Sequence, residues 1–271
     1  MPELPEVETI RNELMPHIIG RQVTGVTLNW EGMVRNGSAT DFCSRLTGQK
    51  ITGIGRRGKY LLFNLSGGEI LVIHLRMTGA LLINSALPDE RFIRAVIHLD
   101  EGQDIYFRDP RKFGVMWLSA DETAITGKLG PEPLEDGFTT EVLTRLLCDR
   151  VAPIKALLLE QALVAGIGNM YADEAIFAAG IHPLRRGGSL SRDEVARLFV
   201  VIQQVLRAAI DHQGASVRNY YRPGGELGTA HFQFNVAHCG GKPCNKCGTP
   251  IQRVVVRNRG TYFCPRCQPE A

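Results

Sequence analysis

Two pairs of cysteines near the C-terminus constrain this chain more than any other feature of its sequence. Cys244 pairs with Cys247 and Cys264 with Cys267 at the spacing Cys-x-x-Cys, and 16 residues separate the two pairs. Two such pairs on tight turns can close a tetrahedron of thiolates around Zn²⁺, and four thiolates leave the metal no open position. The sequence therefore predicts one structural zinc ion rather than disulfide bonds or a catalytic metal. Cys239 lies close by but lacks a partner at this spacing.

The segment between the cysteine pairs has the pattern of a β-hairpin. Apolar residues at 251–256 are followed by Asn258-Arg259-Gly260 and then by a second apolar run at 261–263, which predicts strand, turn and strand. Arg259 would lie in the turn, where its guanidinium could bind a phosphate. A solvated turn residue would fit the position equally well, so the residues alone leave both interpretations open.

Hydrophobic periodicity predicts different structures in the two halves of the chain. Near the N-terminus, apolar residues three and four positions apart indicate a helix with Pro5 in its first turn. From about residue 22 to 118, short apolar runs between turn residues indicate the strands of a sandwich or a barrel. The clearest runs occupy residues 60–65, 69–75, 93–99 and 114–118.

Residues 119–136 are rich in Asp, Glu, Gly and Pro and predict a linker. Helical periodicity follows, with a long helix expected after a capping box formed by Ser191 and Glu194. The three shorter helices are expected at about 139–149, 153–165 and 169–179. Residues 214–230 are Gly-rich and predict a loop. These elements together predict an α+β protein, and 271 residues are enough for two modest domains or one large one.

The break Gly166-Ile167-Gly168-Asn169 separates two of the predicted helices. Free N–H groups at the start of the second helix could bind an anion such as a DNA phosphate, with Asn169 at the cap and Lys155 close by. An ordinary capped helix explains the same residues, so this motif alone does not decide between them.

The charge of the chain is divided unevenly. Residues 1–149 contain 16 Lys and Arg and 20 Asp and Glu, a net charge of −4, whereas residues 150–271 contain 15 and 8, a net charge of +7. A basic half favours a polyanionic partner, although many basic surfaces are merely solvated. No apolar run reaches the roughly 20 residues of a membrane span, and the acidic start MPELPEVETI is unlike a signal peptide. A cytoplasmic protein without a membrane partner is therefore expected.

Pro2 follows the initiator methionine. Removal of Met1 would expose a secondary amine that can attack an aldehydic sugar carbon and form an electron-withdrawing iminium ion. Glu3 is close enough to move protons. Proline and glutamate are also favoured in the first turn of any helix, so catalysis and helix initiation both remain possible on these residues alone.

Six segments, taken in order, resemble the formamidopyrimidine-DNA glycosylases, the bacterial enzymes that repair oxidised purines. They are PELPEVET, GKYLLF, HLRMTG, FRDPRKFG, GIGNMYADEA and CPRCQ, and they span residues 2 to 268. The resemblance implies a monomeric base-excision-repair enzyme that removes 8-oxoguanine and formamidopyrimidines from double-stranded DNA. The enzyme would then nick the abasic site by β- and δ-elimination.

The resemblance also implies the fold and the domain boundaries. An N-terminal helix and a two-layered β-sandwich would be followed by a helix-two-turn-helix domain with a C-terminal zinc-finger hairpin. The expected boundaries are residues 1–118 for the catalytic sandwich, 119–136 for the linker, 137–230 for the helical domain with a loop that closes over the extruded base, and 231–271 for the zinc hairpin.

Catalytic roles follow from the matching motifs. Pro2 would be the Schiff-base nucleophile and Glu3 its acid–base partner. Lys59 would assist β-elimination, and Arg259 would contact a phosphate and assist δ-elimination.

DNA contacts are implied for two further groups of residues. One group would enter the duplex and fill the space left by the flipped nucleotide: Met77, Arg111 and Phe113. The other group resembles the family's phosphate contacts: His74, Arg150, Lys155 and Asn169. A base must leave the duplex before its glycosidic bond can be attacked, and apolar wedges offset part of the unstacking cost of a few kcal/mol.

The sequence departs from the family pattern at a few positions. Arg76 stands where many relatives have Gly, and Phe92 stands where several have a His that reaches DNA, so that contact is not expected here. The segment VAHCGGKPC lacks a basic residue often found before the first cysteine pair, which leaves some phosphate contacts near the hairpin in doubt.

Two alternative functions remain. An endonuclease VIII-like enzyme would prefer oxidised pyrimidines, and a non-catalytic protein on the same scaffold would bind damaged DNA without cutting it. The presence of Pro2, Glu3 and Lys59 together argues against the non-catalytic alternative, because a binding protein has no use for that combination.

Overall fold

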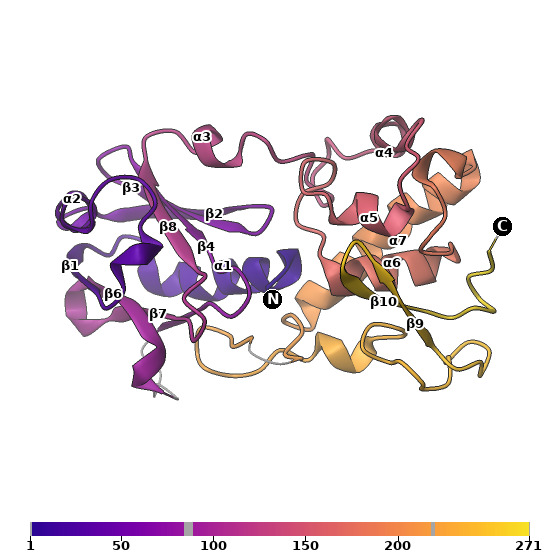
Figure 1. Ribbon diagram of the computed structural model, residues 1–271. Coiled ribbons are helices and arrows are strands. Elements are labelled where there is room, and N and C mark those ends of the chain that lie inside the picture. The colour runs from indigo at the N-terminus through magenta and orange to yellow at the C-terminus, as the bar shows by residue number, and fades with distance from the viewer. Residues whose placement is uncertain (1, 84–88, 218–219, 271) are drawn as a thin grey trace. The chain divides into compact units, whose positions relative to one another are not determined.

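The computed structural model describes residues 2–83, 89–217 and 220–270, and the chain divides into two compact units (Figure 1). Unit 1 comprises Met1–Lys128 and Ile210–His231, and unit 2 comprises Leu129–Ala209 and Phe232–Ala271.

Unit 1 contains two four-stranded sheets whose strands pair antiparallel, with the orders β1-β6-β7-β5 and β2-β3-β4-β8. The strands are β1 (Val23–Leu28), β2 (Ile51–Arg57), β3 (Tyr60–Leu65), β4 (Ile70–His74), β5 (Ala80–Ile83), β6 (Ile93–Leu99), β7 (Asp104–Arg108) and β8 (Val115–Ser119). The helices are α1 (Leu4–Ile18), η1 (Glu31–Met33), α2 (Ala39–Leu46), η2 (Glu90–Phe92), η3 (Asp100–Gly102) and α3 (Thr123–Thr126).

A single hydrophobic core takes side chains from both sheets and from α1. Phe63 and Ile73 come from one sheet and Ile97 and Phe107 from the other, and each is at most 4% exposed. Two separate sheets around one core form a sandwich and not a barrel, which decides the alternative that the strand pattern left open. The four strongest predicted strands correspond to β3, β4, β6 and β8 within one residue.

Helix α1 packs against this core along the predicted stripe. Pro5 occupies its first turn, where the missing N–H of proline costs nothing. The five side chains of the stripe are each 0% exposed: Leu4, Val7, Ile10, Leu14 and Ile18. Burial of large apolar side chains stabilises the fold by about 1.5–3 kcal/mol each, so the stripe anchors the N-terminal residues on the sandwich.

Unit 2 combines helices with a two-stranded hairpin. Its helices are α4 (Thr140–Leu147), α5 (Ile154–Leu159), α6 (Asn169–Ala179), η4 (Gly187–Ser189) and α7 (Arg192–Asp211), whose last two residues belong to unit 1. The hairpin strands are β9 (Gln252–Val256) and β10 (Arg259–Phe263), and η5 (Ala230–Gln233) lies at the boundary between the units at residues 231 and 232. None of the helices in the described part of the chain combines the length and the hydropathy that a membrane span requires.

The capping box at the start of α7 is confirmed. Glu194 Oε2 accepts the N–H of Ser191 at 2.8 Å, and Ser191 Oγ accepts the N–H of Glu194 at 3.2 Å. These reciprocal bonds satisfy two N–H groups that a helix start otherwise leaves without partners.

Helix α5 ends at Leu159, earlier than the predicted end at 165. The side chain of Gln161 explains the difference, because it donates to the carbonyls of Leu159 and Ile167 and accepts the N–H of Gly166. A polar side chain that bonds nearby backbone groups competes with the helical pattern.

The predicted cap at Asn169 is wrong. Gly168 is the N-cap of α6, and Asn169 is the first helical residue. The Nδ2 of Asn169 instead donates to the carbonyl of Gly260 at 3.0 Å. A long-range partner on the hairpin therefore holds this side chain, and spacing along the chain could not indicate it.

The units also differ from the expected boundaries, because residues 210–231 pack with the sandwich and not with the helical domain. Tyr220 is 4% exposed within the core of unit 1. Arg222 pairs with Glu13 of α1 at 2.7 Å, and the carbonyl of Pro223 accepts the N–H of Ile83 at 2.9 Å. These contacts tie the Gly-rich segment to α1 and β5.

Candidate active site and nucleic-acid interface

Pro2 and Glu3 lie directly before α1, and Glu3 is the N-cap of that helix. Both residues are buried, with Glu3 2% exposed. The backbone N–H of Glu3 donates to Glu6 Oε2 at 2.7 Å. A carboxylate in the first turn is stabilised by the helix dipole and by the N–H groups there. The conformation of the residue that follows Pro2 is therefore fixed by α1.

Glu6 connects this N-terminal corner to the Gly-rich segment. Its side chain is 0% exposed, and Glu6 Oε1 accepts the N–H of Ala215 at 2.8 Å. Gly214 has φ +77°, and a Cβ there would lie 2.9 Å from Glu6 Cγ, so both the backbone conformation and the available space require glycine. The sequence analysis gave Glu6 no role, because no local pattern reveals a partner 209 residues away.

Lys59 lies in the short turn between β2 and β3, where Arg57 pairs with Tyr60. Gly58 has φ +56°, which makes so tight a turn possible. The side chain of Lys59 is only 7% exposed. The turn therefore holds Lys59 within unit 1.

His74, at the end of β4, is buried and neutral. Burial, followed by the charges of Arg76 and Lys59, lowers the pKa of His74 to about 3. His74 Nδ1 accepts the N–H of Arg76 at 2.9 Å, and the ring stands edge-on to Tyr60 with centroids 4.5 Å apart. Because Nδ1 is the acceptor, the proton of the neutral ring lies on Nε2. His74 can therefore donate one hydrogen bond to an anion without carrying charge.

A buried carboxylate organises the turn after β7. Asp109 is 1% exposed and accepts from Thr78 Oγ1 and from the N–H groups of Phe113 and Gly114, both at 2.7 Å. It also accepts the N–H of Arg111 at 3.2 Å. Several N–H donors to one carboxylate hold the intervening backbone in a single shape.

This turn brings the three predicted wedge residues together on the surface. Met77 is 39% exposed and Phe113 43% exposed. The Arg111 side chain joins them, since its Nη1 lies 3.5 Å from Met77 Sδ and its Cζ lies 4.5 Å from the Phe113 ring centroid. Core residues would be buried, so exposure of these apolar side chains favours a binding surface over a packing role.

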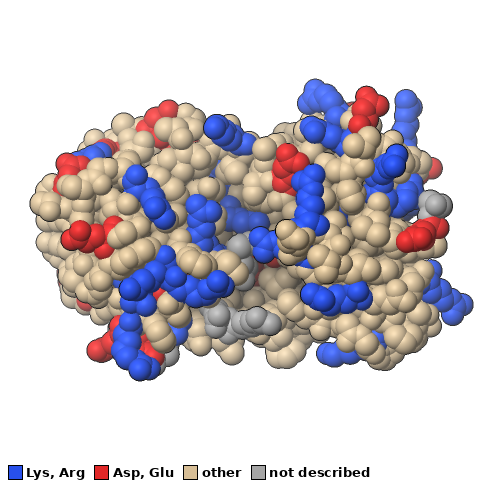
Figure 2. Space-filling view, in the orientation of Figure 1, with Lys and Arg blue, Asp and Glu red and all other residues tan. Residues whose placement is uncertain are grey.

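Lys and Arg side chains gather on the face of each unit that Figure 2 shows. In unit 2, Arg150 after α4 and Arg259 on the hairpin are both exposed. The exposure of both guanidinium-bearing residues is compatible with contacts to phosphate oxygens.

Lys155 has a different environment from the one that its predicted role suggests. Its side chain is 0% exposed, and Nζ donates to Asp173 Oδ1 and to the carbonyl of Asn169, both at 2.6 Å. Burial raises the pKa of Asp173 to about 6, although Lys155 opposes the shift. The ammonium group has no exposed surface in this structure, so direct contact with a phosphate does not fit this conformation.

The same group of residues holds the hairpin against α6. Asp173 Oδ2 accepts the N–H of Tyr262 at 3.1 Å, next to the bond between Asn169 and Gly260. Arg257 and Asn258 both have positive φ, at 45° and 60°. The turn is therefore formed by these two residues, and Arg259, expected in the turn, begins β10.

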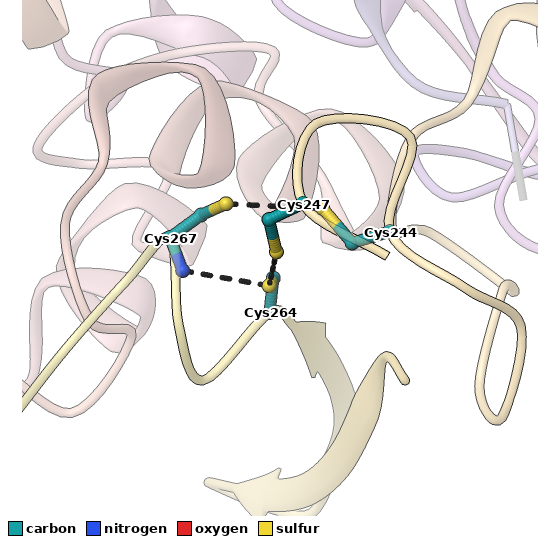
Figure 3. A group of neighbouring side chains, drawn as sticks. All are labelled: Cys244, Cys247, Cys264 and Cys267. Atoms are coloured by element: carbon teal, nitrogen blue, oxygen red, sulfur yellow. Dashed lines mark hydrogen bonds between the residues drawn. The ribbon is translucent and has the colours of Figure 1, made fainter. Parts of the chain in front are cut away.

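The four cysteines of the predicted zinc site converge at the base of the hairpin (Figure 3). Their sulfur atoms lie within 4.8 Å of one another, with Cys244 and Cys267 3.8 Å apart and Cys247 and Cys264 3.5 Å apart. Sulfurs bound tetrahedrally to zinc at about 2.3 Å would be roughly 3.8 Å apart. The residues present therefore fit one structural zinc ion, which leaves no position for a substrate.

The predicted site residues fall into two groups. Unit 1 carries Pro2, Glu3, Lys59, His74 and the wedge residues, whereas unit 2 carries the following: Arg150, Lys155, Asn169, Arg259 and the four cysteines. The sequence analysis missed Glu6, Asp109 and Asp173, which are buried carboxylates that orient these groups. Their partners are distant in sequence or are backbone N–H groups, so residue type and spacing gave no signal for them.

Three family descriptions match consecutive parts of the chain. Residues 1–116 match the formamidopyrimidine-DNA glycosylase N-terminal domain, and residues 129–220 match the formamidopyrimidine-DNA glycosylase H2TH domain. Residues 241–269 match a zinc finger found in FPG and IleRS.

Similar proteins match over nearly the whole length. Formamidopyrimidine-DNA glycosylase of Chloroflexus aggregans is 46% identical, with 99% of this chain and 98% of that protein covered. The crystal structure of the MutM (Fpg) protein of Thermus thermophilus has a TM-score of 0.90 at 39% identity and covers 100% of both chains. A Lactococcus lactis FPG mutant in complex with Fapy-dG-containing DNA has a TM-score of 0.92 at 36% identity, covering 99% of this chain and 100% of the other.

Proposed function

Because the chain belongs to the formamidopyrimidine-DNA glycosylase family, we propose that it excises oxidised purines from double-stranded DNA and then nicks the abasic site. The Lactococcus lactis relatives are described in complex with DNA that contains Fapy-dG or an abasic site. The observation that carries the proposal is the buried pair Pro2 and Glu3 at the start of α1, held through Glu6. A terminal proline amine beside a carboxylate is suited to attack on a sugar carbon.

The proposed chemistry begins after removal of Met1. The Pro2 nitrogen attacks C1′ of the damaged nucleotide, the N–C1′ bond forms, and the base leaves with the electrons of the glycosidic bond and takes up a proton. The Pro2 nitrogen then loses its own proton, which restores the lone pair needed for ring opening. The C1′–O4′ bond then opens, O4′ is protonated, and a C1′=N⁺ iminium remains. Loss of a C2′ proton breaks the C3′–O bond, and a second elimination breaks the C5′–O bond.

Unit 1 residues are assigned the proton transfers in this scheme. Glu3 accepts the proton that the Pro2 nitrogen loses and then gives it to O4′ as the ring opens, because its carboxylate adjoins the nucleophile in the chain. Lys59 assists β-elimination from its buried position in the turn between β2 and β3. Arg259 on the hairpin supports departure of the second phosphate.

The wedge residues are assigned to base extrusion. Met77 and Phe113 would enter the base stack, and Arg111 would hydrogen-bond the base left without a partner. Their exposure and mutual contact support this assignment. Segment 214–230, of which residues 218 and 219 lie outside the described part of the chain, would close over the extruded base, and the bond from Ala215 to Glu6 would link its start to the nucleophile.

Phosphate contacts are proposed for His74, Arg150, Asn169 and Arg259. His74 would act as a neutral donor through Nε2. Lys155 is assigned an indirect role, because its buried ion pair with Asp173 fixes the start of α6. The structural zinc stabilises the hairpin that carries Arg259.

The test uses a duplex with 8-oxoguanine opposite cytosine, incubated with the protein in the presence of borohydride. A reducible covalent adduct is expected, and it should be lost in Pro2→Gly protein but retained in Pro5→Ala protein, since Pro5 has no free amine. Absence of any adduct with a native N-terminus would overturn the proposal. Binding without nicking would indicate the non-catalytic alternative, and a preference for thymine glycol would indicate the pyrimidine-specific one.

A further inference from the structure

Arg108, the last residue of β7, has a buried guanidinium held between aromatic rings. The residue is only 8% exposed, and its backbone pairs with Ala80 of β5 and Ile93 of β6. Its Cζ lies 5.3 Å from the centroid of the Phe92 ring and 5.4 Å from the centroid of the Tyr221 ring. Its Nε is buried and has no hydrogen-bond partner among the residues that the structure describes.

These contacts identify what compensates for the burial of a charged group. A guanidinium within about 6 Å of a ring centroid is attracted by the ring quadrupole, and more strongly where water is excluded. The buried Nε forgoes a hydrogen bond that solvent would provide. The two rings are therefore the aromatic partners of this side chain, and its charge also acts on the carboxylate of Asp89. Arg108 joins the rings into one unit, named here the Arg108 cluster (Phe92, Arg108 and Tyr221).

The cluster lies between two parts of unit 1 that the proposed function uses, segment 214–230 and the turn that carries Arg111 and Phe113. Tyr221 belongs to segment 214–230, and its neighbour Arg222 pairs with Glu13 of α1. On the other side, Arg108 precedes Asp109, whose carboxylate shapes the turn that carries Arg111 and Phe113. The side chain of Arg108 thus connects β7, which leads into the turn with Arg111 and Phe113, to Tyr221 in the segment proposed to cover the base.

We propose that Arg108 is a positioning residue for base recognition, which holds the ring of Tyr221 in place for contact with an extruded purine. This inference rests on the proposed function. Excision of a damaged base requires that the base be held, whereas nicking of a preformed abasic site does not, because that substrate contains no base. Loss of the Arg108 contact should therefore separate the two activities.

The experiment compares kcat/KM on two duplexes, one with 8-oxoguanine opposite cytosine and one with a preformed abasic site. Arg108→Gln should lower base excision at least tenfold and leave abasic nicking within twofold of the unmodified protein. Tyr221→Leu should reproduce this pattern, whereas Tyr221→Phe, which keeps the ring, should behave as the unmodified protein. Because Arg108 and Tyr221 act through one contact, the double variant R108Q/Y221L should lose no more than either single variant.

Arg91→Gln is the matched control. Arg91 also lies over Phe92, at 5.7 Å, but it is 84% exposed and pairs with Asp89. Its loss should leave the ratio of the two activities within twofold. Equal falls in both activities of Arg108→Gln, or no fall in either, would overturn the inference. Failure of the unmodified protein to excise 8-oxoguanine would instead count against the proposed function.

Discussion

The buried pair of Lys155 and Asp173 gives the sharpest prediction for stability. Asp173→Asn would leave the Lys155 ammonium without its counter-ion at a site where the two side chains are 0% and 1% exposed and 2.6 Å apart. Removal of one partner from a buried pair costs about 3–5 kcal/mol, because the remaining charge has no solvent. For a protein near this size, 1 kcal/mol shifts Tm by about 2–4 °C, so the unfolding of unit 2 should shift by roughly 6–20 °C.

Calorimetry is the assay of choice, because Trp30 and Trp117, the two tryptophans of the chain, both belong to unit 1 and their fluorescence would not report on unit 2. The double variant K155M/D173N removes both charges and keeps an acceptor for the Tyr262 N–H. It should recover at least half of the loss, since neutral replacements of a buried pair are often tolerated.

Asp41→Asn provides the comparison at an exposed pair. Arg45 and Asp41 lie one helical turn apart and are 38% and 48% exposed, so this loss should cost at most about 1 kcal/mol. An Asp173→Asn protein that unfolds within 2 °C of the unmodified one would show that the pair does not hold α6 and the hairpin together.

Three further predictions concern other parts of the chain. Between pH 8 and pH 5, unit 1 should lose about 2 kcal/mol of stability that His74→Gln protein does not lose. The reason is that the pKa of His74 is about 3 in the folded protein and about 6.5 unfolded, so only the unfolded state gains a proton in this range. Denaturant titrations measure the free energy of unfolding at each pH, and the same pH dependence for both proteins would contradict this. Cys264→Ser should abolish stoichiometric binding of zinc and weaken DNA binding, because the hairpin depends on the metal for its fold. Metal analysis measures the zinc content and fluorescence anisotropy measures the affinity for DNA. Full affinity for DNA without zinc would refute the prediction. Glu6→Gln should lower the free energy of unfolding by about 1–3 kcal/mol, because the side-chain amide has one oxygen and cannot replace both carboxylate oxygens that accept the Glu3 and Ala215 N–H groups. Urea unfolding measures this change, and an unchanged midpoint would show that these two hydrogen bonds do not stabilise unit 1.

Local patterns in the sequence were sufficient for the elements of the fold. The stripe of α1 and the short apolar runs of β3 and β4 follow from the need to bury apolar side chains in the core. The four cysteines specify their own site because thiolate geometry around zinc is nearly fixed. In each case the information lies within one short segment.

Features that depend on distant partners could not be predicted in this way. The burial of Lys155 in an ion pair depends on Asp173, which lies on another helix. The placement of residues 210–231 in unit 1 depends on contacts of Ala215 and Arg222 with α1. A hydrogen bond between segments far apart in the chain leaves no periodicity for a sequence pattern to show.

The central claim is that the amine at the start of the mature chain forms the bond to the sugar. After borohydride reduction, nuclease digestion and proteolysis, tandem mass spectrometry can locate the DNA remnant on a single peptide. The remnant is expected on the peptide that begins with Pro2. A remnant on the peptide that contains Lys59, a buried lysine of unit 1, would contradict the account.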